Sequence, residues 1–536
     1  IQSVIAGLEA QGRGPVKRIE THASTVLLFQ GAGYKIKKPV DYGFLDFSSP
    51  QKRRASAELE VELNRPLAPG VYLGVLPIFR EADDSWRVGE ASEEAEPDVE
   101  PDDWALHMAR LPAERMLERL LREGALDDDE LEGHLSAIVR KLAAFHDQCQ
   151  TGPEIDQHAT PEGLSKRILG NLDECRPFAG EPPDRPSDDP KQTPPIPARL
   201  LASIQERAEA FIRQESALLN RRVEQNRIRE GHGDLHPGNI CLTDDGPVIY
   251  DRLEFCRAFR CADVAAEIAY LAMELDHAGR PQLANRFVRR YATETADPDL
   301  ESLQPLYRVH YAMVRSKVSA LAGANEGAEA IARSSGYAAL AGGYFAPPSL
   351  IMLTGLPATG KSTIARSIAR TLRGELLRSD VIRKELAGMA PSQRPASEKE
   401  REALYSQAAS DNTYAAMLDK ARERLAAGRT VIADANFPSP DRREPFIGLA
   451  RELGRPFICV HTTADESMVR ERLRERRERP DEASDADERV YETLASKYTP
   501  PKRPDEVRSL ITHEAGTRIE VTCVRVAEAL LHCSTG

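Results

Sequence analysis

A short stretch in the middle of the chain, HGDLHPGNI, places a carboxylate and a carboxamide five positions apart, at Asp234 and Asn239. A second carboxylate follows at Asp251, where the apolar run VIYD ends. Transfer of a phosphoryl group needs a side chain that positions or deprotonates the acceptor hydroxyl, together with oxygen ligands for Mg²⁺. Two carboxylates and one amide meet both needs, so this stretch predicts a phosphotransfer site.

A second and different phosphate-binding pattern, GLPATGKST, follows about a hundred residues later and fits the consensus GxxxxGK[ST]. A β-like run, LIMLTG, precedes it and a helix-like run, TIARSIARTL, follows. The glycines let backbone N–H groups face phosphates at the N-terminus of a helix, where the helix dipole also favours anions. We expect Lys361 to reach the terminal phosphates of ATP and Ser362 to bind Mg²⁺. The predicted nucleotide-binding residues are Gly355, Gly360, Lys361, Ser362 and Thr363.

Carboxylates and arginines that could complete the second site lie further along the chain. One short β-like run ends at Asp380 and is followed by Arg383; another ends at Asp434, a candidate Mg²⁺ ligand. Arg472 and Arg476 are four positions apart in an arginine-dense helix and therefore share a face. Such a helix could close over ATP and neutralise charge on the transferring phosphoryl group. For any single arginine, a solvated helix rich in glutamate is the alternative.

The surrounding elements predict two domains. Residues up to about 110 read as β-runs and one helix, and the pattern is mostly helical from 113 to 345, which is the outline of a small β lobe and a large helical lobe. The prolines of FAPPSL cannot continue a helix, so we place a boundary there, between domains 1–345 and 349–536. Acidic or proline-rich stretches at 81–103 and 176–197 read as surface loops.

The first domain resembles the aminoglycoside phosphotransferase-like kinases, whose loop reads HGDxHxxN and is followed by an apolar run that ends in aspartate. The runs DYGFLDF and NRPLAPGVYLGV resemble one branch of that family. The resemblance implies an α+β bilobal protein-kinase-like fold that binds ATP, with Asp234 as the catalytic base and with Asn239 and Asp251 as metal ligands. Gly233 stands where protein kinases carry arginine, so control by a phosphorylated activation loop is not expected.

This fold also requires a strand lysine for the ATP phosphates and a helix glutamate to hold it. Lys35 and Lys37 share one face of a β-run, because side chains alternate along a strand. The family pattern favours Lys35, and leaves Lys37 as a solvated side chain. Three glutamates alternate along the following helix, and Glu60 is preferred over Glu58 and Glu62.

Residues 349–500 resemble the small P-loop kinases that include polynucleotide 5′-kinases, zeta toxins and gluconate kinases. The resemblance implies an α/β fold with a parallel sheet, with Asp380 as the base at the acceptor hydroxyl and Arg383 as an acceptor-binding residue. Members of this group differ widely in substrate. The acceptor therefore stays open between a small molecule with a hydroxyl group and the end of a nucleic acid.

Composition excludes several classes of protein. No stretch approaches about 18 uninterrupted apolar residues, so no membrane partner is expected. The 8 cysteines are scattered without a CxxC pair, which favours reduced thiols and a cytoplasmic location. Residues 349–536 hold 31 Lys and Arg against 29 Asp and Glu, whereas the rest holds 41 against 56. The acidic first part is thus a poor platform for nucleic acid.

Two ATP-binding patterns in one chain favour a bifunctional ATP- and Mg²⁺-dependent phosphotransferase, in which each domain transfers the γ-phosphate to a hydroxyl acceptor. One alternative is a kinase joined to a regulatory nucleotide-binding domain. Another is an RNA or DNA 5′-hydroxyl kinase that works through the P-loop domain, with the first domain accessory. The oligomeric state is not indicated by the sequence.

Overall fold

The computed structural model describes residues 17–43, 45–81, 85–90, 100–181, 194–393, 395–477, 488–502 and 509–533. They divide into two compact units: the first holds 1–164, 214–278 and 282–304, and the second holds 165–213, 279–281 and 305–536. Residues 165–213 and 305–345 thus group with the C-terminal part, although the sequence placed them with the N-terminal part. The boundary at 345–349 stays a prediction. Much of both predicted loops, 82–84, 91–99 and 182–193, lies outside the described residues.

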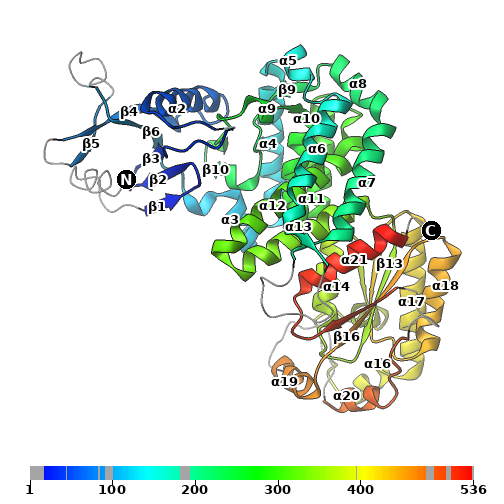
Figure 1. Ribbon diagram of the computed structural model, residues 1–536. Coiled ribbons are helices and arrows are strands. Elements are labelled where there is room, and N and C mark those ends of the chain that lie inside the picture. The colour runs from blue at the N-terminus through cyan, green and yellow to red at the C-terminus, as the bar shows by residue number, and fades with distance from the viewer. Residues whose placement is uncertain are drawn as a thin grey trace. The chain divides into compact units, whose positions relative to one another are not determined.

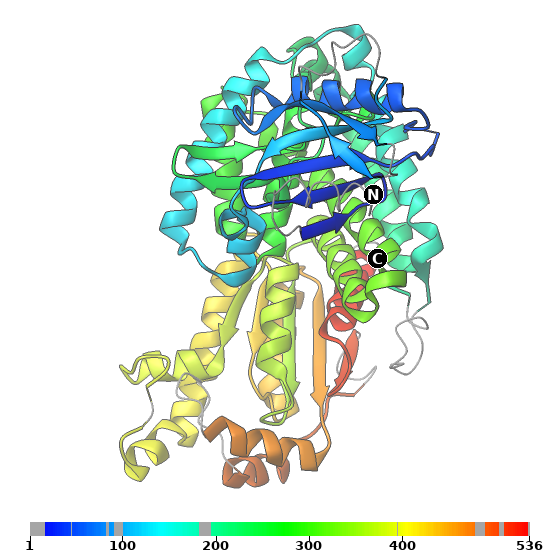
Figure 2. The same ribbon diagram turned by 90° about the vertical axis from the view of Figure 1, so that its left-hand side faces the viewer.

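An antiparallel sheet of six strands opens the first unit, in the order β1-β2-β3-β6-β4-β5. Its strands are β1 (Lys17–Glu20), β2 (Ser24–Leu28), β3 (Ala32–Lys37), β4 (Tyr72–Arg80), β5 (Trp86–Val88) and β6 (Asp103–Ala109). Helix α2 (Pro50–Asn64) packs against β4 and β6, as Figure 2 shows. The Ser49 side chain caps α2 by accepting a hydrogen bond from Lys52 N, and Pro50 fits the first turn. Tyr34 and Ile36 enter the core on the other face of the sheet, so Lys35 and Lys37 face α2.

Helices and two small strand pairs complete the first unit. The helices are α3 (Leu117–Glu123), α4 (Asp128–Gln148), α5 (Pro153–Asp156), α8 (Ser216–Glu224), α9 (Arg257–Arg260), α10 (Val264–His277) and α11 (Pro281–Glu294). Strand β9 (Ile228–Glu230) pairs with β12 (Cys261–Asp263), and β10 (Ile240–Thr243) pairs with β11 (Gly246–Ile249). The β10–β11 hairpin turns through two residues into Gly246, whose φ of 114° suits glycine. This hairpin places Asn239 directly before one strand and Asp251 shortly after the other.

The second unit contains a parallel sheet of five strands, in the order β14-β15-β13-β16-β17, so the predicted parallel α/β sheet is confirmed. Its strands are β13 (Leu350–Gly355), β14 (Glu375–Arg378), β15 (Val431–Asp434), β16 (Phe457–Thr463) and β17 (Leu510–Glu514). Every residue of β13 is buried, as expected for a strand covered on both faces. Helices α14 (Lys361–Thr371) and α21 (Ile519–Cys533) cover one face, and α17 (Gln407–Ala426) and α18 (Pro440–Glu452) cover the other (Figure 1). The shorter helices of this unit are α15 (Ser379–Leu386), α16 (Glu398–Leu404), α19 (Glu466–Arg477) and α20 (Glu488–Ala495).

Four further helices belong wholly or largely to the second unit: α6 (Pro161–Glu174), α7 (Ala198–Gln214), α12 (Leu300–Glu326) and α13 (Ala328–Phe345). Helix α13 packs closely on α14 and α21. A Cβ atom at Gly343 would lie only 2.6 Å from Thr371 O, so glycine permits this close approach. Arg207 adds a hydrogen bond from Nη2 to Leu531 O at 2.9 Å. Among the described residues, no helix combines the length and apolarity needed to cross a membrane.

Candidate active sites

Two histidines hold the loop that carries Asp234. His232 is buried; its Nδ1 accepts a hydrogen bond from Asp234 N at 3.2 Å, so Nε2 carries the proton and donates to Tyr250 O at 3.0 Å. Burial lowers the pKa of His232, which keeps this tautomer neutral. His236 Nδ1 accepts from Gly238 N at 3.0 Å. The loop is therefore fixed on both sides of Asp234.

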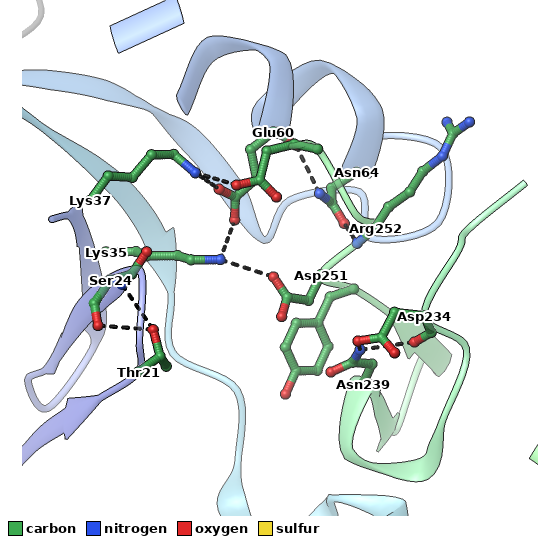
Figure 3. Close-up of polar contacts among 12 residues, drawn as sticks. Thr21, Ser24, Lys35, Lys37, Glu60, Asn64, Asp234, Asn239, Asp251 and Arg252 are labelled. Carbon is green, nitrogen blue, oxygen red and sulfur yellow. Dashed lines mark hydrogen bonds and ion pairs between the residues drawn. The ribbon is translucent and has the colours of Figure 1, made fainter. Parts of the chain in front are cut away.

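The structure brings the three residues of the first predicted site together (Figure 3). Asn239 Nδ2 donates to Asp234 O at 3.0 Å and to Asp234 Oδ2 at 3.3 Å. Because the amide nitrogen is used in this way, the amide oxygen is the atom that is left to face a cation. Asp251 adopts a φ of 62°, which is unusual for a residue other than glycine, and its N–H donates to the Tyr72 hydroxyl at 2.9 Å. Backbone strain of this kind concentrates at functional sites.

Lys35 joins the helix and the Asp251 segment. Its Nζ lies 2.8 Å from Glu60 Oε1 and 3.0 Å from Asp251 Oδ1. Burial alone would lower the pKa of Lys35, but the carboxylates of Asp251, Glu60 and Glu254 outweigh it and raise the pKa well above its ordinary value. Lys35 likewise lowers the pKa of Asp251, although burial opposes the shift. Lys35 is therefore a charged bridge between Glu60 and Asp251, the pairing that the family resemblance leads us to expect.

The expectation that Lys37 is solvated is wrong. Its side chain is buried, and Nζ lies 2.8 Å from Glu60 Oε2 and also pairs with Glu254. The physical reason is that β3 presents Lys35 and Lys37 to the same face, beneath α2, where Glu60 offers one oxygen to each. Glu58 and Glu62 are exposed on α2, because a displacement of two residues turns a helical side chain away from its neighbour.

A buried hydrogen-bond network that the sequence reasoning missed holds the Asp234 loop through the backbone of Gly233. Glu267 on α10 accepts a hydrogen bond from Gly233 N at 2.6 Å and pairs with His146 Nε2 at 2.7 Å. The other ring nitrogen of His146 bonds the Tyr291 hydroxyl at 2.7 Å. A Cβ atom at Gly231 would lie 2.5 Å from Glu267 Oε1, so the loop passes too close for a larger residue. The available signal was the acid Glu267 within the otherwise apolar run VAAEIAYLAM.

The P-loop pattern forms the predicted turn between β13 and α14. Gly355 and Gly360 have φ values of 147° and 98°, and a Cβ atom at Gly355 would lie 2.5 Å from Thr462 O. Lys361 Nζ donates to Leu356 O at 2.7 Å, which places the ammonium group over the loop. Thr363 follows on the exposed side of the first turn of α14, with its N–H donating to Gly360 O at 3.1 Å.

Asp434 ends β15 beside this turn. It is buried, and it lines the same pocket as Ser362. Burial raises the pKa of Asp434, whereas Lys361, Ser362 and Arg378 act in the opposite direction. The hydroxyl and the carboxylate thus lie together where the sequence predicts oxygen ligands for Mg²⁺.

A pocket of about 720 Å³ adjoins the P-loop in the second unit. Its lining includes the predicted residues Lys361, Asp380 and Arg383, among others. It also includes Tyr414 and Arg442, which the sequence reasoning missed. Asp380 lies close enough to raise the pKa of both Asp434 and Tyr414, although burial is the larger cause in each case. Asp380 therefore lies in the same pocket as the phosphate-binding turn and the arginines.

Of the two arginines predicted to close over ATP, Arg472 and Arg476, the structure describes the side chain of Arg472. Arg472 Nη1 donates to Ala358 O at 3.2 Å, so its guanidinium group lies against the P-loop. The side chain of Arg476 lies outside the described residues, as do residues 478–487 of the Asp/Ser turn.

Comparison with known proteins supports both sequence resemblances. Residues 94–306 match the family model described as the phosphotransferase enzyme family, and residues 350–501 match that of an AAA domain. The expected order, a phosphotransferase-like part followed by a P-loop kinase-like part, is confirmed. Proteins of Mycobacterium tuberculosis and Mycobacterium bovis, described as uncharacterized, are 28% identical to this chain over 458 residues. The matched region spans 85% of this chain and 85% of each of those proteins.

Solved structures similar to parts of the chain include an ADP-bound aminoglycoside phosphotransferase, at 11% identity and a TM-score of 0.35, covering 63% of this chain and 96% of that one. A gluconokinase from Sinorhizobium meliloti 1021 has 20% identity and a TM-score of 0.22, over 34% of this chain and 92% of that one. A protein described as a putative kinase from Chloroflexus aurantiacus has 23% identity and a TM-score of 0.27, over 33% of this chain and 96% of that one.

Proposed function

We propose that the chain is an ATP- and Mg²⁺-dependent phosphotransferase with two active sites, each of which transfers the γ-phosphate to a hydroxyl acceptor. The matched families support phosphotransfer in general. The observation that carries the proposal furthest is the ion-pair bridge from the buried Glu60 through Lys35 to Asp251, beside Asp234 and Asn239. A structural ion pair alone would not need a catalytic-loop aspartate and an amide at this spacing.

In the first site, the six-stranded sheet and the following helices act as the two lobes of a kinase-like fold. Lys35 binds the ATP phosphates, and Glu60 keeps its ammonium group in place. The oxygens of Asn239 and Asp251 suit Mg²⁺, a hard cation that prefers such ligands and that, when bound, neutralises charge on the phosphates. Asp234, whose carboxylate is partly exposed, orients the acceptor hydroxyl and takes its proton.

In the second site, the P-loop backbone and Lys361 bind the phosphates, and Ser362 with Asp434 forms the oxygen pair suited to Mg²⁺. Asp380 orients and deprotonates a second hydroxyl acceptor. Arg472, which lies against Ala358 O, offers positive charge to the transferring phosphoryl group. Both sites thus contain a base, a cation for the phosphates and oxygen ligands for a metal.

Two single substitutions, Asp234→Asn and Asp380→Asn, test the proposal. Each purified full-length variant is incubated with labelled ATP, Mg²⁺, a panel of hydroxyl metabolites and 5′-hydroxyl oligonucleotides. We expect each substitution to remove the phosphorylation of a different acceptor while nucleotide binding persists. If one site binds ATP but no acceptor depends on it, that site is regulatory; if neither substitution lowers any phosphorylation, the proposal is wrong.

A further inference from the structure

Arg383 on α15 is a buried cation without a carboxylate partner in the described part of the chain. It is only 9% exposed, its Nη1 donates to Leu404 O at 3.4 Å and to Ser410 Oγ at 3.2 Å, and its Nε has no hydrogen-bond partner there. Burying a guanidinium group with only neutral partners is costly, because its charge loses hydration without gaining an ion pair. An arginine kept in this state is available to bind an anion.

The stacking of Arg383 fixes the direction of its N–H groups. Its guanidinium carbon lies 4.9 Å from the centroid of the Tyr405 ring. A planar guanidinium group that rests on an aromatic face keeps its N–H donors at the edge, where they can bind the two oxygens of a carboxylate or phosphate together.

A second arginine is held in the same manner nearby. The guanidinium carbon of Arg442 lies 4.8 Å from the Tyr414 ring, and Asp411 pairs with its Nη2. Tyr414 is itself fixed, because its hydroxyl accepts a hydrogen bond from Phe437 N at 3.1 Å. The charges of Arg383, Arg442 and Asp380 all act on Tyr414, and all four residues line the same pocket. Two oriented arginines thus line the pocket that also holds the proposed base.

We infer that the acceptor of the P-loop site is a compact hydroxyl compound that already carries an anionic group, a carboxylate or a phosphate. Arg383 and Arg442 bind this group while the hydroxyl faces Asp380. This inference rests on the proposed function of the second site. In the transfer step the hydroxyl oxygen bonds to the γ-phosphorus, the bond from that phosphorus to the β–γ bridging oxygen breaks, the proton passes to Asp380, and ADP leaves.

A small acceptor fits better than a nucleic acid. The pocket of about 720 Å³ has to hold the nucleotide as well as the acceptor, and Arg383 is nine-tenths buried, so only a compact anion can reach it. Nucleic-acid binding relies instead on many exposed cations along a groove. Residues 349–536 have an excess of only two basic residues, 31 against 29.

The test uses the full-length protein saturated with ADP and Mg²⁺, and titrates inorganic phosphate and D-gluconate separately by calorimetry. We expect at least one of the two anions to bind. Which of them binds shows whether the site prefers a phosphate or a carboxylate. The Arg383→Gln variant is expected to weaken that binding at least about tenfold, because a charge-assisted bidentate contact is lost. Arg383→Lys should recover only part of the affinity, since lysine keeps the positive charge but lacks the planar pair of N–H donors of the guanidinium group.

ADP affinity of the second site is measured in a Lys35→Met background, in which the first site does not take up nucleotide, and Lys361→Met shows what loss of the second site looks like. This affinity should change less than about threefold in Arg383→Gln. Retained ADP binding shows that the variant is folded. If neither anion binds, or if both variants bind the anion as the parent does, the inference is wrong, whether or not the site uses ATP. If only a 5′-hydroxyl oligonucleotide binds, with affinity that falls steeply with salt, the acceptor is a nucleic acid instead. If Lys361→Met leaves ADP uptake unchanged, the proposed function of this site fails as well.

Discussion

Lys37 Nζ lies 2.8 Å from Glu60 Oε2, the carboxylate oxygen that Lys35 does not use. Lys37 also pairs with Glu254, which follows Asp251 by three residues. A row of buried charges therefore runs from the segment after Asp251, through Lys37, to helix α2. This second lysine holds Glu60 in the orientation in which Glu60 can hold Lys35.

Replacing Lys37 by methionine is expected to destabilise the first unit by about 3 kcal/mol, because the buried carboxylates of Glu60 and Glu254 lose a partner. Adding Glu254→Gln should recover part of that loss. Urea unfolding of the single and double variants measures both effects. Lys38→Met is the matched control; its partner Glu20 is at the surface, so we expect a change of at most about 1 kcal/mol. Equal effects for both lysines would contradict the role given to Lys37.

Lys35→Met is expected to lower phosphotransfer by the first site at least a hundredfold, because the phosphates lose their cation and Asp251 loses its neighbour. Transfer by the P-loop site should stay unchanged. Rates with the acceptor of each site, measured in the same preparation, separate these outcomes. A parallel loss at both sites would show that the variant is misfolded or that the sites are not independent.

His232 predicts a pH dependence of stability. Its folded-state pKa is lowered by burial, whereas the unfolded state takes up a proton near the ordinary value of about 6.5. Below that pH the unfolded state binds a proton that the folded state rejects, so stability falls as the pH falls, by up to about 1.4 kcal/mol per pH unit. The contribution is fully present above pH 6.5.

The His232→Asn variant should be less stable at pH 8, since the ring hydrogen bonds are lost, yet its stability should fall less steeply between pH 6.5 and 4.5. Unfolding midpoints of both proteins across this range measure the slopes. Identical slopes would contradict the buried, neutral state of His232.

Gly231→Ala tests the network beneath the Asp234 loop. The added Cβ atom would lie 2.5 Å from Glu267 Oε1, so we expect a loss of about 1–3 kcal/mol and lower turnover at the first site. Gly133→Ala is the control, because this glycine lies within α4 with open space around it. Alanine there should raise stability by up to about 1 kcal/mol without affecting turnover. Thermal unfolding and first-site rates of both variants provide the comparison.

Sequence could predict those features that depend on local pattern. The apolar runs that end at Gly355 and Asp434 predicted strands, and the alternation along β3 placed Lys35 and Lys37 on one face. Alternation could not show that α2 buries both lysines, because that depends on packing between elements. Glu267, His146 and Tyr291 come from three separate helices, so no spacing in the sequence links them.

The acceptor side of the P-loop pocket shows the same limit. Arg383 followed from a family motif, but its burial and its contact with Tyr405 depend on how α16 packs beside α15. Arg442 lies almost sixty residues further on in α18, and only the fold brings it to the same pocket.

The central claim is that one chain holds two nucleotide sites. Calorimetric titration of the full-length protein with a non-hydrolysable ATP analogue and Mg²⁺ tests it most directly. We predict two equivalents for the parent protein, one each for Lys35→Met and Lys361→Met, and none for the double variant. Uptake of a single equivalent by the parent protein, or an unchanged stoichiometry in either single variant, would contradict the claim.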